Sequence, residues 1–283
     1  MKILIADSGA TKADWYLVED GNIIHYFSGK GISPVFQNQI EITEELKKNV
    51  IPEFEKWYID MICFYGSGCT AEKIPIVREA INQSFYIDKI EVYSDLIAAA
   101  HCLCGDNAGI ACILGTGSNS CEWDGKVIVK HISPLGFILG DEGSGAYLGK
   151  RLLGDALKNR LSEGLREKLL SEYELTPAKI IDRVYREPYP SRFLASLSPF
   201  IIENILDESI RCIVTESFDQ FFVRNVMQYN YKDYEVNFVG SIAWHYSELL
   251  NETAKNRDII VGKIIKSPIE GLIDYYKSET KPL

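Results

Sequence analysis

One local pattern occurs twice in the chain, and this repeat limits the folds that are open to it. Residues 2–24, KILIADSGATKADWYLVEDGNII, contain an apolar run, a turn of small residues, a second run and an Asp-Gly turn. Residues 109–128, GIACILGTGSNSCEWDGKVI, follow the same order. Apolar runs joined by such short turns predict β-hairpins. A hairpin that recurs later in the chain indicates a duplicated unit, with one copy in each of two domains.

The segments that follow the first hairpin predict an α/β fold. Apolar residues at helical spacing occur at 39–58 and 74–85, and strand-like apolar runs occur at 61–70 and 89–95. Strands that alternate with helices favour a parallel or mixed sheet. Near the C-terminal end, the strand pattern of YEVNFV changes to a helical one, for which Ser241 is a candidate N-cap.

The length and composition fit two domains. A chain of 283 residues, 46% of them hydrophobic, can bury one large or two medium cores. The repeat favours two, which we place at 1–106 and 107–283. The second domain would carry a helical insertion, and the final helix, PIEGLIDYYKSE, could pack back on the first domain.

Charge and cysteine content exclude several classes of protein. The formal net charge of -10 disfavours nucleic acids and anionic membranes as partners. The apolar run after Met1-Lys2 is too short for a signal peptide, and no apolar run approaches bilayer length. Seven cysteines, several of them within apolar runs, are typical of reduced core thiols. We therefore expect a cytoplasmic protein.

The cluster HCLCG could supply half of a zinc site from His101, Cys102 and Cys104. No second cluster of cysteine and histidine accompanies it, and its surroundings have a helical pattern. A structural role for these residues is the simpler interpretation.

The two small-residue turns could bind anionic oxygens. Turns of Gly, Ser and Thr present consecutive backbone N–H groups, and glycine allows a close approach. The P-loop and Rossmann motifs are both missing from the sequence. Two such turns, one from each half of the chain, could together hold a polyphosphate. The alternative is that a hairpin needs small turn residues for geometric reasons alone.

Three acids lie where α/β proteins place their chemistry. Asp7 ends an apolar strand, Asp95 follows the strand IEVYS, and Asp141 lies in GDEGSG. Ligands of α/β sheets bind at the carboxyl ends of strands. The structural alternatives are an N-cap role for Asp95 and a first-turn position on a helix for Asp141.

The order and spacing of five motifs identify a resemblance to a known family. DSGATK, SDLIAAA, LGTGSNS, GDEGSGAYLG and VNFVGSIA follow one another as in the N-acetylglucosamine kinase family, often grouped with the BadF/BadG/BcrA/BcrD-type ATPases. This family belongs to the superfamily of sugar kinases, heat-shock ATPases and actin. The resemblance covers essentially the whole chain. It implies two ribonuclease-H-like α/β domains around an ATP-binding cleft, which is the actin-like ATPase fold.

The resemblance also implies a reaction and a set of site residues. It implies an ATP-dependent kinase with Mg²⁺ as cofactor that phosphorylates an amino sugar, first of all N-acetylglucosamine at its 6-hydroxyl. Asp95 would be the catalytic base, and Asp7 would hold the Mg²⁺. The nucleotide would contact Ser8, Gly9, Ala10, Thr11, Lys12, Gly115, Thr116, Gly117, Ser118, Gly240 and Ser241. The sugar would contact Ser67, Gly68, Asp95, Thr116, Gly117, Asn119 and Asp141.

Two departures from the family pattern leave the sugar open. Ser33 precedes Pro34 where the family often has asparagine, and Leu135 precedes Gly136 where better-known members have tryptophan. N-acetylmuramic acid, glucosamine and glucose are therefore alternative substrates. Further alternatives are a BadF-type activator ATPase and a filament-forming or chaperone-like nucleotide switch. The oligomeric state is also left open by the sequence, with a homodimer as one alternative.

Overall fold

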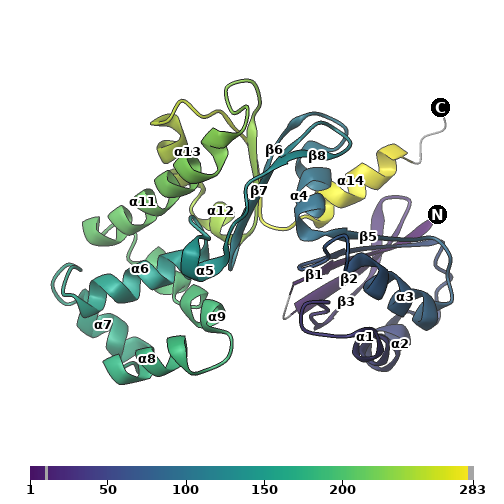
Figure 1. The fold of residues 1–283 in the computed structure, drawn as a ribbon, viewed down its shortest axis with the longest axis horizontal. Helices are drawn as coiled ribbons and strands as arrows, with labels where there is room; N and C mark the ends of the chain where they lie inside the picture. The colour runs from purple at the N-terminus through teal and green to yellow at the C-terminus, as the bar shows by residue number, and fades with distance from the viewer. Residues whose placement is uncertain (10–11, 280–283) are drawn as a thin grey trace. The chain divides into compact units, whose positions relative to one another are not determined.

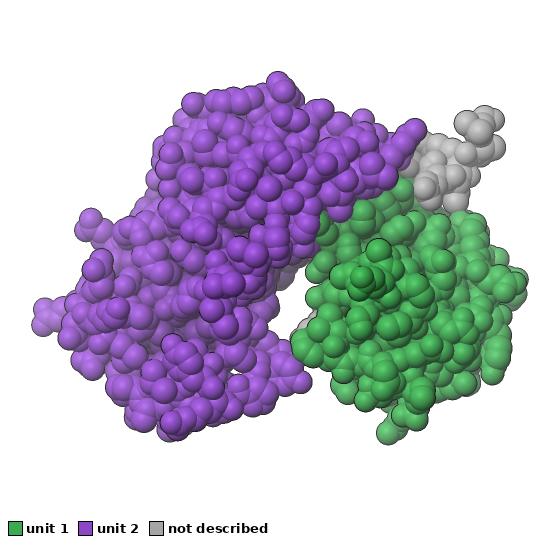
Figure 2. All heavy atoms as spheres, viewed as in Figure 1, with its two compact units in different colours: residues 1–105, 268–283 green, residues 106–267 purple. Residues whose placement is uncertain are grey.

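The computed structural model describes residues 1–9 and 12–279. It separates into two compact units, which Figure 2 shows in green and purple. Unit 1 consists of Met1–Gly105 and Pro268–Leu283, and unit 2 of Asp106–Ser267. The boundary after Gly105 lies next to the expected domain boundary after residue 106, while the final helix belongs to unit 1. No helix among the described residues is both long and apolar enough to cross a membrane.

Unit 1 is built on a five-stranded mixed sheet with the order β3-β2-β1-β4-β5 (Figure 1). The pairs β1–β2 and β2–β3 are antiparallel, whereas β1–β4 and β4–β5 are parallel. The strands are β1 (Lys2–Ser8), β2 (Lys12–Glu19), β3 (Asn22–Lys30), β4 (Met61–Gly66) and β5 (Ile90–Ser94). The helices are α1 (Gln39–Glu45), the π-helix η1 (Leu46–Val50), α2 (Ile51–Phe54), α3 (Ile74–Phe85), α4 (Asp95–Cys104) and α14 (Ile269–Glu279).

Helices pack on both faces of this sheet, which explains why β1 is apolar at consecutive positions. Leu4 and Ala6 belong to the core beneath α1 and α3. Ile3 and Ile5 point to the opposite face, where they line a pocket together with Tyr276 of α14. Burial on both faces therefore fixes the position of β1 at the centre of the sheet.

Unit 2 repeats this topology in its own sheet, which has the order β10-β9-β6-β7-β8. The pairs β6–β7 and β7–β8 are antiparallel, whereas β6–β9 and β9–β10 are parallel. The strands are β6 (Gly109–Leu114), β7 (Ser118–Trp123), β8 (Ile128–His131), β9 (Val236–Val239) and β10 (Val261–Ile265). The duplicated hairpin predicted from the sequence is confirmed, because β1–β2 and β6–β7 occupy equivalent places in the two sheets.

Most helices of unit 2 lie between β8 and β9 in the sequence, as expected for a helical insertion. They are α5 (Gly136–Leu139), α6 (Gly145–Leu157), α7 (Leu165–Glu172), α8 (Pro177–Tyr185), α9 (Pro190–Ala195), α10 (Ser198–Glu203), α11 (Glu208–Arg224) and the 3₁₀ helix η2 (Val226–Gln228). Two more, α12 (Ser241–His245) and α13 (Ser247–Lys255), follow β9.

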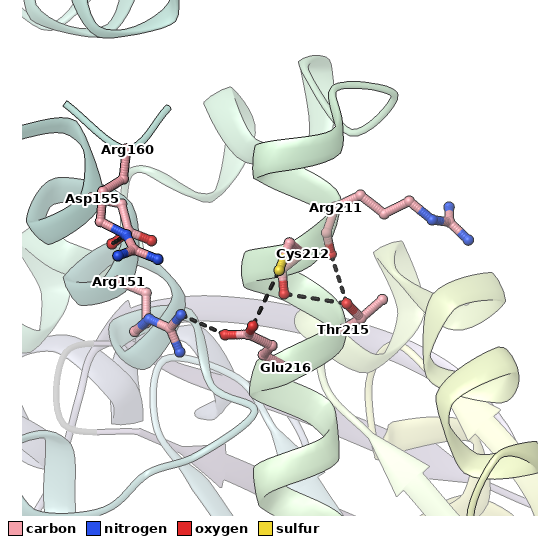
Figure 3. Close-up of polar contacts among 7 residues, drawn as sticks. All are labelled: Arg151, Asp155, Arg160, Arg211, Cys212, Thr215 and Glu216. Atoms are coloured by element: carbon pink, nitrogen blue, oxygen red, sulfur yellow. Dashed lines mark hydrogen bonds and ion pairs between the residues drawn. The ribbon is translucent and has the colours of Figure 1, made fainter. Parts of the chain in front are cut away.

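An ion pair joins two of these helices at their surface. Arg151 of α6 donates to Glu216 of α11 over 2.6 Å, and the same carboxylate accepts a hydrogen bond from the exposed Cys212 thiol over 3.2 Å (Figure 3). Below this surface, Leu148 and Phe218 are fully buried in the core of unit 2. The apolar core supplies most of the stabilisation here, because exposed ion pairs contribute little.

The starts of two helices differ from the sequence-based expectations. Ser94, and not Asp95, caps α4: its hydroxyl accepts a hydrogen bond from the N–H of Ile97. Gly240 is the N-cap of α12, so the predicted N-cap role of Ser241 is wrong. The φ angle of Gly240 is +124°, which a serine at this position would rarely adopt.

The packing of α14 on α4 surrounds a buried histidine. His101 stacks on Tyr275 with ring centroids 4.0 Å apart, and its Nδ1 lies 2.9 Å from the hydroxyl of Tyr65. The rings of Tyr65 and Tyr93 also meet the imidazole at their edges. His101 thus has a packing role.

We expect the free energy of unfolding to decrease as the pH is lowered from 6.5 to about 4, because His101 is buried in its neutral form. Burial lowers the pKa of this histidine to about 4. The unfolded chain therefore binds more protons here between pH 6.5 and about 4, and folding loses about 3 kcal/mol across this window. Urea titrations of wild type and His101→Gln at several pH values test this. The free energy of unfolding of the variant should depend less on pH than that of wild type. The same dependence on pH in both proteins would contradict the expectation.

Candidate active site

The carboxyl ends of β1, β4 and β5 bring the predicted residues of unit 1 to one edge of its sheet. Ser8 pairs with Gly66, and Gly66 pairs with Ser94, so the three strands end in register. Asp7 precedes this row and Asp95 directly follows it. This edge is where parallel strands place ligand chemistry.

Asp7 and Asp95 lie close enough to influence each other. The pKa of Asp7 is raised to about 6, first by burial and then by the negative charges of Asp14 and Asp95. Burial also raises the pKa of Asp95. Backbone N–H groups at the start of α4 lower this pKa and partly offset the effect of burial. Asp95 is the first residue of this helix and not its N-cap, so the structural alternative for Asp95 is wrong.

These acids form an electrostatic environment that suits a divalent cation. The repulsion from Asp14 and Asp95 that raises the pKa of Asp7 is relieved when a cation binds beside Asp7. Mg²⁺ is commonly bound through one or two carboxylates, waters and substrate phosphates. No cluster of three or more His, Cys, Asp or Glu side chains among residues 1–9 and 12–279 could hold a metal by itself. Asp7 fits Mg²⁺ as a partial ligand.

Asp14 belongs to this edge of the sheet and was missed by the sequence analysis. It pairs with Asp7 across the β1–β2 hairpin. Its carboxylate accepts a hydrogen bond from Tyr26 over 2.7 Å and lies 3.0 Å from the ammonium group of Lys12. Lys12 is otherwise exposed, as a predicted phosphate ligand should be. The hairpin register could have revealed Asp14, because the turn sets which residues face Asp7.

The first predicted phosphate loop is only partly described. Ala10 and Thr11 lie outside the described residues. The N–H of Gly9 donates to the carbonyl of Lys12 over 2.9 Å, which closes the turn. Ser8 is buried, and its hydroxyl donates to the carbonyl of Ile32 and accepts from the N–H of the same residue. The hydroxyl of Ser8 therefore holds the neighbouring loop.

The same loop connects Ser33 to the predicted sugar residues Ser67 and Gly68. The N–H of Ser67 donates to the carbonyl of Ser8 over 2.8 Å, and the hydroxyl of Ser33 donates to the carbonyl of Ser67 over 3.1 Å. Gly68 has a φ of +79°, and a Cβ atom there would lie 2.4 Å from Val35. Ser33, the first departure from the family pattern, thus lies beside Ser67 and Gly68, as expected.

In unit 2, the second predicted phosphate loop joins β6 to β7 and is anchored to α6. The N–H of Gly115 donates to the carbonyl of Gly117 within the turn. The N–H groups of Gly145 and Ala146 donate to the carbonyls of Gly115 and Thr116 over 2.9 and 3.0 Å. Among the described residues, no acceptor is found for the N–H groups of Thr116 and Gly117, so these two are the best placed for a phosphate oxygen.

Asp141 packs against this loop in an unusual backbone conformation. Its φ is +56°, which is uncommon for a residue other than glycine and often marks a functional position. The carboxylate accepts a hydrogen bond from the N–H of Ser118 over 3.3 Å and lies over Gly117, where a Cβ would be 3.2 Å away. Helix α6 begins four residues later with Ser144 as its cap, so Asp141 is not a first-turn acid.

Gly115, Thr116 and Ser241 meet at one pocket of unit 2, with a volume of about 200 Å³. Gly240, which precedes Ser241, packs against the backbone just before Gly115. A Cβ atom at Gly240 would be 2.3 Å from the carbonyl oxygen of Leu114. The pocket is completed by residues that the sequence analysis missed, namely Gly145, Ala195, Ser198, Pro199, Ile202, Ile242 and His245. It therefore combines the second loop with a partly apolar wall, which suits a nucleoside next to phosphates.

Asn119 lies at the start of β7, beside Ser118. Its side chain is half-buried, and its Oδ1 lies 3.0 Å from Nε2 of His131 on β8. Asn119, Ser118 and Asp141 thus come together in unit 2, while Ser67, Gly68 and Asp95 gather in unit 1.

Comparison with known proteins gives one match of high identity. No family model matches the chain, and no curated protein matches it. Among solved structures, the "Putative N-acetylglucosamine Kinase" from Porphyromonas gingivalis is 47% identical, with a TM-score of 0.96. The alignment covers 99% of this chain and 100% of that one.

Two further structures share the fold. A "Putative N-acetylglucosamine Kinase" from Chromobacterium violaceum is 17% identical with a TM-score of 0.74, covering 97% of this chain and 98% of that one. A ROK family glucokinase from Streptomyces griseus, solved with glucose and AMPPNP, is 12% identical with a TM-score of 0.55, covering 97% and 98%. The two ribonuclease-H-like α/β units predicted from the sequence are confirmed. With its high identity to the Porphyromonas gingivalis protein over the full length of both chains, this chain belongs to the N-acetylglucosamine kinase family of sugar kinases and actin-like ATPases.

Proposed function

We propose that this protein transfers the γ-phosphoryl group of ATP to the 6-hydroxyl of N-acetylglucosamine. The observation that carries the reaction is the placement of Asp7 and Asp95 at one sheet edge, where their charges interact. The choice of sugar rests on the 47% identity to the Porphyromonas gingivalis protein. We further infer a cytoplasmic enzyme that acts on small molecules and binds neither nucleic acid nor membranes.

Phosphoryl transfer needs alignment and charge neutralisation more than covalent chemistry from the protein. Asp95 accepts the proton of the sugar hydroxyl as its oxygen forms a bond to the γ-phosphorus. The bond from that phosphorus to the β,γ-bridging oxygen breaks, and ADP leaves. Burial makes Asp95 a stronger base than an exposed aspartate, since its pKa is raised.

The two turns orient the nucleotide in this proposal. Gly9, Ala10, Thr11 and Lys12 act from unit 1, and Thr116 and Gly117 supply N–H groups from unit 2. Mg²⁺ held by Asp7, when bound, neutralises the negative charge of the transferred phosphoryl group. Gly240 and Ser241 let the adenosine lie close to the backbone, next to the pocket at Ser198 and His245.

In this proposal the sugar is recognised by Asn119, Asp141, Ser67, Gly68, Thr116 and Gly117. Asp141 supplies a carboxylate acceptor whose pKa burial raises. N-acetylmuramic acid, glucosamine and glucose are the competing substrates, because Ser33 and Leu135 depart from the family pattern near this site.

The cysteines argue against a BadF-type activator ATPase. A cluster bound between subunits needs paired cysteines at the surface. Five of the seven are buried, Cys104 is half-buried and Cys212 is exposed on α11. A colourless purified protein is the expected result.

A panel of sugars tests the proposal. We expect ADP release with Mg²⁺ and ATP to increase most with N-acetylglucosamine, and less with glucosamine, glucose and N-acetylmuramic acid. If one of the other sugars had a higher kcat/KM, that sugar would be the preferred substrate in place of N-acetylglucosamine. ADP release that no sugar stimulates would contradict the kinase assignment.

A further inference from the structure

The hydrogen bonds of Asn119 lead to a residue outside the proposed site. Its Oδ1 accepts a hydrogen bond from the N–H of Ser120 over 3.0 Å and lies 3.0 Å from Nε2 of His131. His131 belongs to β8, where it pairs with Cys121 of β7. Asn119 and Cys121 are two positions apart and share one face of β7, so His131 is a diagonal cross-strand neighbour of Asn119.

This arrangement determines the orientation of the Asn119 amide and the protonation of the His131 ring. A backbone N–H can only donate, so the Asn119 atom that it meets is the carbonyl oxygen and not the amide nitrogen. The same oxygen can only accept from the ring of His131, so Nε2 must carry a proton. His131 is largely exposed, and partial desolvation lowers its pKa, which favours the neutral ring. The expected tautomer has hydrogen on Nε2 and none on Nδ1.

The amide group of Asn119 is thereby held in one orientation. With its oxygen engaged twice, Nδ2 is left as a donor of two hydrogen bonds, and no acceptor for it is found in residues 1–9 and 12–279. The preceding residue, Ser118, binds the carboxylate of Asp141 through its N–H. The carboxylate of Asp141, held by Ser118, thus lies near the amide donor of Asn119. An amide donor beside a carboxylate acceptor is a combination suited to the hydroxyl and acetamido groups of a sugar.

We propose that His131 is a positioning residue for sugar recognition, which holds the Asn119 amide so that Nδ2 donates to an oxygen atom of the sugar. The inference rests on the proposed kinase function. Without the histidine, the amide could rotate and offer its oxygen instead, and the free energy needed to fix it would be lost from sugar binding.

Three variants separate this role from a structural one. His131→Phe keeps a ring of similar size but removes the donor, His131→Gln keeps an amide donor, and Val129→Thr alters an exposed position of the same strand. We expect His131→Phe to raise the KM for the sugar about five- to tenfold, as for one lost hydrogen bond. The KM for ATP and kcat should change less than about twofold, and His131→Gln should recover most of the sugar affinity.

An NMR measurement of the imidazole nitrogens provides a readout that does not depend on turnover. The ¹⁵N shifts of His131 should show a protonated Nε2 and an unprotonated Nδ1. The opposite tautomer, an unchanged sugar KM in His131→Phe, or an equal rise in Val129→Thr would each overturn the role of His131. A wild-type protein that neither binds nor phosphorylates any sugar would instead overturn the proposed function, and this inference with it.

Discussion

Asp95→Asn should bind ATP normally but phosphorylate the sugar on the order of 10²–10⁴ times more slowly than wild type. The amide is close to the carboxylate in size but cannot accept the proton of the attacking hydroxyl. Asp95 begins α4 and interacts with Asp7, so the substitution also removes one of the charges that raise the pKa of Asp7. The measurements are kcat for the sugar and the dissociation constant of ATP.

Asp88→Asn is a matched control for this variant. Asp88 precedes β5, at the end of the strand opposite to Asp95, and is exposed. Its substitution should leave kcat within about twofold of wild type, as expected for an exposed position away from special features. If Asp95→Asn also turned over at nearly the wild-type rate, Asp95 would not be the base.

Gly240→Ala should lower stability by about 2–4 kcal/mol and weaken ATP binding severalfold. Gly240 has a φ of +124°, and an added Cβ would lie 2.3 Å from the carbonyl oxygen of Leu114 and 3.3 Å from the nitrogen of Gly115. Both neighbours are backbone atoms, so relief of the clash must displace the start of the second proposed phosphate loop. Urea denaturation and the KM for ATP measure the two effects.

Gly154→Ala provides the control for the added methyl group. Gly154 lies within α6, and a Cβ there would meet nothing within 4 Å. Alanine should stabilise this helix by up to about 1 kcal/mol, with no change in the KM for ATP. Equal effects of the two substitutions would contradict the argument from backbone contact.

The hairpins and their duplication could be predicted because their signal is local. Strand β1 is apolar on both faces, and its turn of small residues is short, so the pattern of residues 2–24 specifies strand, turn and strand. The same holds for residues 109–128. In both units the third antiparallel strand then follows an Asp-Gly turn, which is itself a strong hairpin signal.

Helix caps were harder to predict because neighbouring residues offer similar chemistry. In SDLIAAA both Ser94 and Asp95 can cap a helix, and only the backbone decides between them. Ser94 has the extended conformation of a cap, while Asp95 already lies in the helix. At Gly240 a left-handed φ, which the sequence does not encode directly, moved the cap one residue before Ser241.

Residues brought to the site by tertiary packing left no signal in the sequence. Ala195, Ser198 and Pro199 lie at the ends of short helices that have no motif, yet they form one wall of the pocket next to Thr116. His131 is likewise placed by the pairing of β7 with β8, which follows from register and not from spacing alone. Such residues become visible only when the helices and strands are assembled.

In the proposed reaction, the 6-hydroxyl of N-acetylglucosamine receives the γ-phosphoryl group of ATP. Mass spectrometry and ³¹P NMR of the product, with wild-type protein, Mg²⁺ and ATP, test it most directly. We expect one equivalent of N-acetylglucosamine 6-phosphate per ADP, and no sugar phosphate from the 6-deoxy analogue. Phosphate on another oxygen of the sugar, or ADP formed with inorganic phosphate alone, would contradict it.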